Sequence, residues 1–155
     1  MAGFKRSVTI NKPIEEVFDF ATDPANAAKL LPGVTSIKML TEGGMKAGAK
    51  FKETRGIKGK ERSAIIEITE HKRPEVHAAS AAMMGMRATY TFRFFADPAG
   101  TRVDMDADVQ GNFLWWLFLG MMARMMEKED GAYLDRLKAA MESPQDPGTA
   151  SVESL

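Results

Sequence analysis

Apolar and polar residues alternate with a period of two along most of the chain from residue 34 to residue 109, which is typical of β-strands with one buried face. The clearest stretch runs from Met86 to Ala96, where Ala88, Tyr90 and Phe92 alternate with arginine and threonine. Short turns rich in glycine and proline separate most of the segments. With a similar segment near the N-terminus, the pattern predicts strands at 4–11, 34–40, 49–55, 61–70, 76–82, 86–96 and 103–109. We expect a seven-stranded antiparallel sheet with one covered face.

The turn expected at residues 97–100 fixes how the last two strands pair. It places Arg93 opposite Asp104 on the solvent side and Phe92 opposite Met105 on the core side. The same register pairs Thr91 with Asp106, Phe94 with Val103 and Tyr90 with Ala107. The aspartates of the last strand therefore form a charged outer face rather than a catalytic cluster.

Helical patterns occupy two places in the chain. Pro13 opens one short helix, and Asp23 before Pro24 caps a second that runs to about Leu30. The segment 112–142 lacks proline and begins with a capping asparagine; as one helix it would be about 45 Å long. The face expected against the sheet consists of Trp115, Trp116, Leu119, Met122, Ala123, Met126, Tyr133, Leu134, Leu137 and Met141. The resulting order is an α+β helix-grip fold, in which a curved sheet wraps around a long C-terminal helix.

Composition narrows the class of protein. The 155 residues predict one domain over 1–142 and a disordered tail over 143–155. The formal net charge of zero argues against a nucleic-acid partner, and the absence of cysteine excludes disulfides. The longest apolar run, 113–123, is too short to span a membrane, and the N-terminus is not a signal peptide. We expect cytoplasmic residence.

Few residues offer catalytic or metal-binding chemistry. The two histidines, His71 and His77, flank a turn expected at 72–75, which would place His77 opposite Glu70 as a partly exposed pair. The Gly-rich turns at 43–44 and 56–59 are not followed by a helix, so they are not phosphate-binding loops, and no serine lies in a nucleophile motif. We therefore expect neither a metal nor another cofactor, and no catalytic residue can be assigned.

Polar residues on the apolar face of the sheet give the candidate ligand site. Glu53 and Arg55 share a face with Phe51, and Ser80 is expected on the apolar side of its strand. An apolar cavity with a few convergent polar groups is typical of a small-molecule site. In the alternative interpretation, Glu53 and Arg55 lie near a strand end and reach water. The candidate ligand-binding residues are Phe51, Glu53, Arg55, Ser80, Tyr90, Phe92, Met105, Trp116, Leu119, Ala123 and Met126.

Several local motifs resemble a known superfamily. They are PIEEVF at 13–18, Asp23-Pro24, LPGV at 31–34, Gly48, GTRV at 100–103 and LDRLK at 134–138. In this order they resemble START-like proteins, in particular the polyketide cyclase/dehydrase and lipid-transport group, over roughly residues 4–142. The resemblance implies a helix-grip fold with an apolar cavity between sheet and helix. Members bind lipids, sterols, polyketides or plant hormones, and some catalyse cyclisation or dehydration.

Three hypotheses about function follow. The first is a non-enzymatic carrier or sensor of a hydrophobic, lipid- or polyketide-like molecule. The second is a cyclase or dehydratase of aromatic polyketide-like substrates that uses Tyr90, Arg55 and Glu53. It is weakened because no histidine is expected to point inward, and tyrosine and arginine need large pKa shifts to exchange protons near neutrality. The third is a module that docks to a protein or membrane.

The docking hypothesis rests on apolar residues that the sheet cannot cover. Leu114, Leu117, Phe118, Met121 and Met125 lie on the opposite side of the expected helix. We expect a second copy of the chain to cover them, with membrane adsorption as the alternative. A further alternative is that Gly120 breaks the helix and lets its first turns fold inward.

Overall fold

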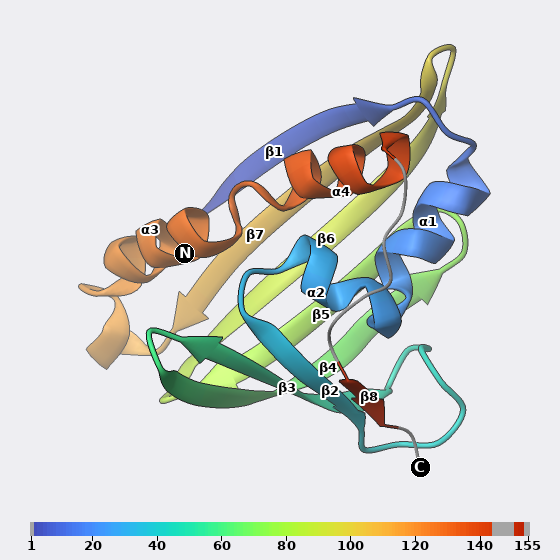
Figure 1. The fold of residues 1–155 in the computed structure, drawn as a ribbon. Coiled ribbons are helices and arrows are strands. Elements are labelled where there is room, and N and C mark those ends of the chain that lie inside the picture. Colours follow the sequence, from blue (N-terminus) through green and yellow to red (C-terminus); the bar gives the residue numbers. More distant parts are fainter. Residues whose placement is uncertain (1, 144–150, 154–155) are drawn as a thin grey trace.

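The computed structural model describes residues 2–143 and 151–153, and one curved antiparallel sheet dominates it (Figure 1). The predicted seven-stranded sheet is confirmed. Its strands are β1 (Ala2–Ile10), β2 (Val34–Met39), β3 (Lys50–Ile57), β4 (Lys60–Lys72), β5 (Val76–Met83), β6 (Met86–Asp97) and β7 (Gly100–Gly111). Their order is β1-β7-β6-β5-β4-β3-β2, so the first strand closes onto the last.

A short eighth strand, β8 (Ser151–Glu153), pairs in parallel with β2. The sequence predicted a tail without regular structure over 143–155, and the structure differs from that prediction at these three residues. The rest of that prediction after residue 143 lies outside the described residues.

The pairing of β6 with β7 confirms the register expected from the turn. Arg93 lies opposite Asp104 and Phe92 opposite Met105; the remaining predicted pairs, Thr91–Asp106, Phe94–Val103 and Tyr90–Ala107, are also present. The core-side positions of β7 are fully buried, whereas its aspartates lie on the outer face. The hydrophobic alternation sufficed here because a one-residue slip would have exchanged the two faces.

The two short helices predicted after β1 are present as α1 (Ile14–Thr22) and as η1 (Pro24–Asn26) running into α2 (Ala27–Leu30). Asp23 caps the second of them, since its carboxylate accepts a hydrogen bond from the Ala25 N–H at 2.9 Å. Both lie on the concave side of the sheet (Figure 1). Phe18 of α1 and Leu30 of α2 belong to the larger hydrophobic core.

The C-terminal segment forms the expected helical layer, but it is not one helix starting at Asn112. It consists of the 3₁₀ turn η2 (Phe113–Trp115), then α3 (Leu119–Asp130) and α4 (Tyr133–Glu142). Asn112 does cap the segment, accepting a hydrogen bond from the Leu114 N–H at 3.1 Å. The interruption falls at Gly131, where a Cβ would lie 2.3 Å from the Glu127 carbonyl oxygen. Only glycine fits that approach, and glycine has low helix propensity.

The 3₁₀ turn separates the two tryptophans that were both predicted to face the sheet. The prediction for Trp116 is wrong, because Trp116 does not lie against the sheet and is 56% exposed. The prediction for Trp115 is confirmed, since Trp115 packs on the core, close enough that a Cβ on Gly111 would lie 3.0 Å from its own Cβ. The residues of a 3₁₀ turn advance by about 120° rather than the 100° used to assign the helix face, which turns Trp116 outward.

The buried side chains form two separate hydrophobic clusters. The larger joins β1, β6 and β7 to α1, α3 and α4, and its fully buried members include Val103 and Leu137. The smaller lies over β2, β3 and β4 and includes Ile37, Phe51 and Ile68. The helices α3 and α4 lie along β1, with α3 also on β7, so they cover only one half of the concave face (Figure 1).

Within the described part of the chain, none of the helices combines the length and the apolar character needed to cross a membrane.

Candidate functional site

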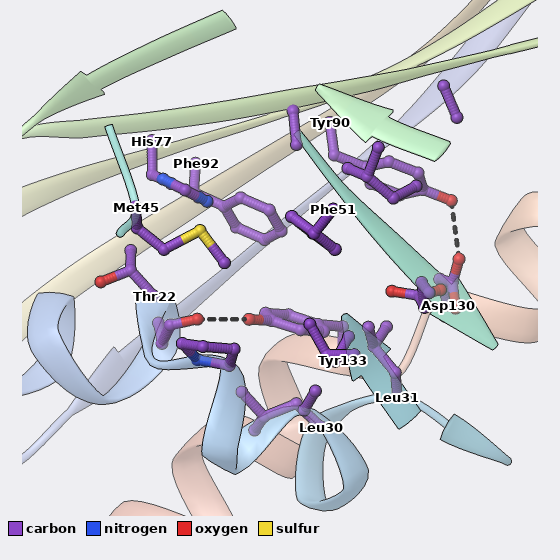
Figure 2. A pocket seen from close by; sticks show the side chains of 18 of the residues that line it. Thr22, Leu30, Leu31, Met45, Phe51, His77, Tyr90, Phe92, Asp130 and Tyr133 are labelled. Atoms are coloured by element: carbon purple, nitrogen blue, oxygen red, sulfur yellow. Dashed lines mark hydrogen bonds between the residues drawn. The ribbon is translucent and has the colours of Figure 1, made fainter. Parts of the chain in front are cut away.

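A cavity of about 170 Å³ lies between the concave face of the sheet and the helices (Figure 2). Its walls include residues of both hydrophobic clusters, such as Phe92 from the larger and Phe51 from the smaller. The connection from α1 to α2 closes one side, and Asp130 and Tyr133 reach it from the junction of α3 and α4. The cavity therefore lies at the boundary between the two hydrophobic clusters.

The sequence of β5 and β6 explains why this boundary is hollow. Ala79 and Ala81 on β5 face the same side as their partners on β6, Tyr90 and Ala88. All four line the cavity. An alanine leaves the space that a larger apolar side chain would fill, and the nearest helices do not fill it. Apolar surface makes up most of the wall.

One end of the cavity carries a connected group of polar side chains, here called the Arg55 cluster: Glu53, Arg55, Tyr90 and Asp130. The Arg55 guanidinium donates through Nε to Glu53 at 2.7 Å and through Nη1 to Asp130 at 3.1 Å. The Tyr90 hydroxyl donates to the other carboxylate oxygen of Asp130 at 2.8 Å (Figure 2). Strand β3 supplies two of these residues from alternate positions, and Asp130 is the last residue of α3.

The surroundings of the cluster shift the pKa values of its tyrosine and its arginine. Burial and the neighbouring Asp130 carboxylate raise the pKa of Tyr90 well above its ordinary value, so the phenol remains a hydrogen-bond donor at neutral pH. Burial acts to lower the pKa of Arg55, but the carboxylates of Glu53 and Asp130 outweigh it and raise that pKa. Burial likewise raises the pKa of Tyr133. None of these three side chains therefore titrates near neutrality.

His77 lines the cavity and contacts His71, with 3.0 Å between their Nδ1 atoms. The prediction that His77 lies opposite Glu70 is wrong, because His77 pairs with His71 and Glu70 with Ala78. The turn between β4 and β5 is one residue shorter than expected, since Lys72 pairs with Val76. Burial, with repulsion from His71, lowers the pKa of His77 to about 4, so its imidazole is neutral at physiological pH.

No group of three or more metal-ligating side chains is assembled anywhere in the described ranges 2–143 and 151–153.

The structure gathers part of the predicted site and disperses the rest. The predicted residues found on the cavity wall are Phe51, Glu53, Arg55, Ser80, Tyr90, Phe92 and Met105. The alternative that Glu53 and Arg55 reach water is not what the structure shows, since the Arg55 side chain is only 18% exposed. Those absent from the wall are Trp116, Leu119, Ala123 and Met126. The last three are buried over β1 and β7, away from the cavity, because α3 covers that half of the sheet.

Ser80 reaches the wall but does not direct its hydroxyl into the cavity. It pairs with Thr89, on the face opposite that of Tyr90, and its Oγ accepts a hydrogen bond from Arg87 at 2.8 Å. The run of alanines around it gives no alternation from which its face could be predicted. The inward positions of β5 are those of His77, Ala79 and Ala81.

Sequence reasoning missed several wall residues, among them His77, Asp130, Met45 and Thr22. Asp130 had one available signal, because it directly precedes a glycine inside an otherwise helical segment. A helix that stops there brings a carboxylate to its last turn. Tyr133 was assigned correctly to the buried face, but not to the site.

Sequence comparison identifies the family. A family model described as polyketide cyclase/dehydrase and lipid transport matches residues 1–142. The chain belongs to this family. No curated protein sequence matches it.

Solved structures share the fold of this family member at low sequence identity. Ara h 8.0201 matches with a TM-score of 0.72 at 14% identity, covering 91% of this chain and 97% of that chain. The di-domain ARO/CYC StfQ from the steffimycin biosynthetic pathway matches with a TM-score of 0.72 at 10% identity, and the match covers 90% of this chain and 50% of StfQ. TTHA0849 from Thermus thermophilus matches with a TM-score of 0.67 at 18% identity, covering 88% and 94% of the two chains. These likenesses establish the helix-grip fold.

Proposed function

We propose that this family member binds an apolar small molecule in the cavity and acts as a carrier or sensor. The observation that carries the proposal is the cavity itself, an apolar space with one buried polar cluster at its end. A pocket of this composition buries the ligand's apolar surface while a few polar groups fix its orientation. The family description, which includes lipid transport, supports the same proposal.

The size of the cavity limits the ligand. Its volume of about 170 Å³ lies below the roughly 300–1,000 Å³ of pockets that hold drug-sized molecules. A molecule of one or two rings fits the space as it stands. A larger lipid or polyketide requires flexible wall residues such as Met45 to move, which an unbranched methionine permits.

Two measurements test the proposal. Native mass spectrometry of the purified protein should reveal a co-purified apolar molecule. Calorimetric titration with naphthylmethanol, a neutral two-ring probe, should show saturable binding at one site. Ala79→Leu adds three carbon atoms to the cavity wall. It should weaken binding roughly tenfold or more, because these atoms occupy space that the probe needs.

Ala139→Leu is the matched control, since Ala139 is exposed on α4 and does not line the cavity. It should bind the probe as the wild type does. Equal binding by both variants, with both folded, would contradict the proposal.

Catalysis on a polyketide-like substrate is the second candidate. The hydrogen bond from Tyr90 to Asp130 beside Arg55 favours it, since it provides a polar group that can orient a carbonyl or hydroxyl. The raised pKa values of Tyr90 and Arg55 weaken it, because neither side chain exchanges protons easily near neutrality. We therefore place binding ahead of catalysis.

A second copy of the chain is proposed to cover the large exposed apolar surface at one end of the molecule, here called the apolar patch. Its members are between 44% and 82% exposed: Met83, Met84, Phe113, Leu114, Trp116, Leu117, Phe118, Met121 and Met125. The β5–β6 turn and η2 lie against each other there, since a Cβ on Gly85 would lie 2.7 Å from Trp115 Nε1.

The area of the patch supports a homodimer. At roughly 200 Å² for each large side chain, the exposed part totals on the order of 1,000 Å². A standard interface buries about 800 Å² on each partner. Sedimentation should give a dimer that Leu117→Glu converts to monomer, whereas Ile65→Glu, at an exposed position on β4, should leave it intact. A wild-type monomer, or a vesicle-bound monomer, would contradict the homodimer.

A further inference from the structure

The ionisable side chains around the cavity include more acidic groups than basic ones. Three carboxyl groups, those of Asp23, Glu53 and Asp130, belong to its wall. Arg55 is the one lysine or arginine among the described residues of that wall. Asp23 is exposed at the rim, where its carboxylate caps η1, so the imbalance inside the cavity rests on Glu53 and Asp130.

The single guanidinium contacts both of those carboxylates, so one positive charge faces two carboxyl groups. Its Nε is 2.7 Å from Glu53 and its Nη1 is 3.1 Å from Asp130. The side chains of the three residues are only 9–18% exposed. A ligand carboxylate that competed for Arg55 would leave one of these buried carboxylates without its counter-charge, and such a loss is costly in a buried site.

The remaining polar groups of the cluster are better acceptors than donors. The Tyr90 hydroxyl donates its proton to Asp130, which leaves the lone pairs of its oxygen for an incoming group. The carboxylates of Glu53 and Asp130 accept hydrogen bonds and cannot donate them when ionised. A hydroxyl or ammonium group meets complementary partners there, and an anion meets like charges.

We propose that the cavity selects apolar ligands whose polar group donates hydrogen bonds, an alcohol, phenol or amine, and rejects carboxylic acids. This inference rests on the proposed binding function and specifies the class of ligand. Free fatty acids and other apolar carboxylates are thereby poor ligands, whereas neutral hydroxylated or basic apolar molecules of one or two rings are good ones.

Three naphthalene compounds of matched shape test the selectivity by calorimetry near neutral pH: naphthylmethanol, naphthylmethylamine and naphthoic acid. The alcohol and the amine should each bind at least about ten times more tightly than the acid. This is expected because the carboxylate of the acid would lie a few ångströms from the carboxylates of the cluster, at an effective dielectric constant of about 20. The amine and the alcohol together separate an effect of charge from an effect of hydrogen bonding. If the amine exceeds the alcohol, charge contributes; if they are equal, the donated hydrogen bond suffices.

A charge-neutralising variant identifies the source of the selectivity. Glu53→Gln keeps the shape of the side chain and removes one carboxylate, so the gap between acid and alcohol should narrow at least about threefold. Glu67→Gln is the matched control, since Glu67 lies on β4 opposite Ser80, on the other face of the sheet. It should leave the gap unchanged. Asp130→Asn provides the second test if Glu53→Gln does not fold, as judged by circular dichroism.

The outcomes separate this inference from the binding proposal. If no naphthalene compound binds, the binding proposal fails and the inference fails with it. If all three bind but the acid binds as tightly as the alcohol, the cavity is a binding site and only the inference is overturned. A gap that responds equally to Glu53→Gln and Glu67→Gln would also overturn it.

Discussion

The two halves of the concave face are built from the same kind of strand but are filled differently. Over β1 and β7, the helices α3 and α4 press on the sheet, and positions such as Val103 and Leu137 are fully buried. Over β3, β4 and β5, the cover consists of α2, the end of α1 and the β2–β3 loop, and the cavity remains. We call these the solid half and the hollow half.

The difference shows what decides whether such a sheet encloses a cavity. Strand pairing does not decide the outcome, since one antiparallel sheet runs through both halves. The deciding features are the placement of the long helical layer along β1 and the small side chains of β5. The hollow half also contains buried ion pairs, which join Arg55 to Glu53 and Asp130.

The largest expected effect comes from removing the charge that holds the hollow half together. Arg55→Met leaves two buried carboxylates unpaired, so the free energy of unfolding should fall by about 3–5 kcal/mol. Arg62→Met is the control, because Arg62 lies opposite Arg55 on β4, is exposed, and donates to the half-buried Glu129 at 3.3 Å. It should cost about 0–1 kcal/mol. Equal losses in urea unfolding would show that the Arg55 cluster does not stabilise this half.

Truncating one apolar residue in each half should separate solid from hollow. Leu137→Ala removes a fully buried side chain from the solid half and should cost about 2–5 kcal/mol. Met45→Ala truncates a half-buried residue at the cavity wall, where space already exists, and should cost less than about 1 kcal/mol. Denaturant unfolding measures both. A Met45→Ala loss as large as that of Leu137→Ala would mean that the cavity is not a void in solution.

Acid should destabilise the hollow half through His77. An unfolded histidine titrates near pH 6.5, whereas the native pKa of His77 is about 4, so between these values the unfolded chain binds a proton that the native chain does not. The free energy of unfolding therefore falls as the pH drops, by up to roughly 3 kcal/mol at about 1.4 kcal/mol per pKa unit. The neighbouring His71, whose pKa burial also lowers, adds in the same direction.

His77→Gln isolates this contribution, since carboxyl groups elsewhere respond to acid in both proteins. The difference in unfolding free energy between wild type and variant should shrink as the pH is lowered from about 7 to about 5. A difference that stays constant over that range would contradict a buried neutral His77.

The smallest effect belongs to the edge of the solid half. Trp116→Ala should change the free energy of unfolding by no more than about 0.5 kcal/mol in a monomer, because Trp116 is largely exposed. Trp115→Ala should cost clearly more, since Trp115 packs against Gly111 and the β5–β6 turn. If Trp116→Ala costs as much as Trp115→Ala, Trp116 is covered in solution. The dependence of that cost on protein concentration will then show whether a second copy of the chain covers it.

The sequence predicted the elements of both halves better than the site between them. The pairing of β6 with β7 and the caps at Asp23 and Asn112 follow from local patterns, because alternation and capping act over a few residues. The end of α3 at Asp130 and the outward turn of Trp116 were not predicted, because a single helical period was applied across Gly131 and across the 3₁₀ turn η2.

The polar part of the site illustrates the same limit. Glu53, Arg55 and Tyr90 could be placed on the inner face because each lies on a strand with clear alternation. Asp130, the partner of both Arg55 and Tyr90, lies 75 residues further along the chain than Arg55, and no local pattern links them. Ser80 was placed on the wrong face because alanine on both sides makes the two faces of β5 alike.

The contact between the two imidazoles has a spectroscopic consequence. His71 and His77 are the only histidines of the chain, and one of them lines the cavity while both touch the ring of Phe18. Their Nδ1 atoms share one hydrogen bond, so one ring must donate and the other accept, which fixes complementary tautomers. The imidazole region of a nitrogen-correlated NMR spectrum therefore contains signals from just two rings. A molecule that enters the cavity should change the chemical shifts of these signals. Occupancy of the cavity by an unlabelled ligand can therefore be followed without assigning the rest of the protein's spectrum.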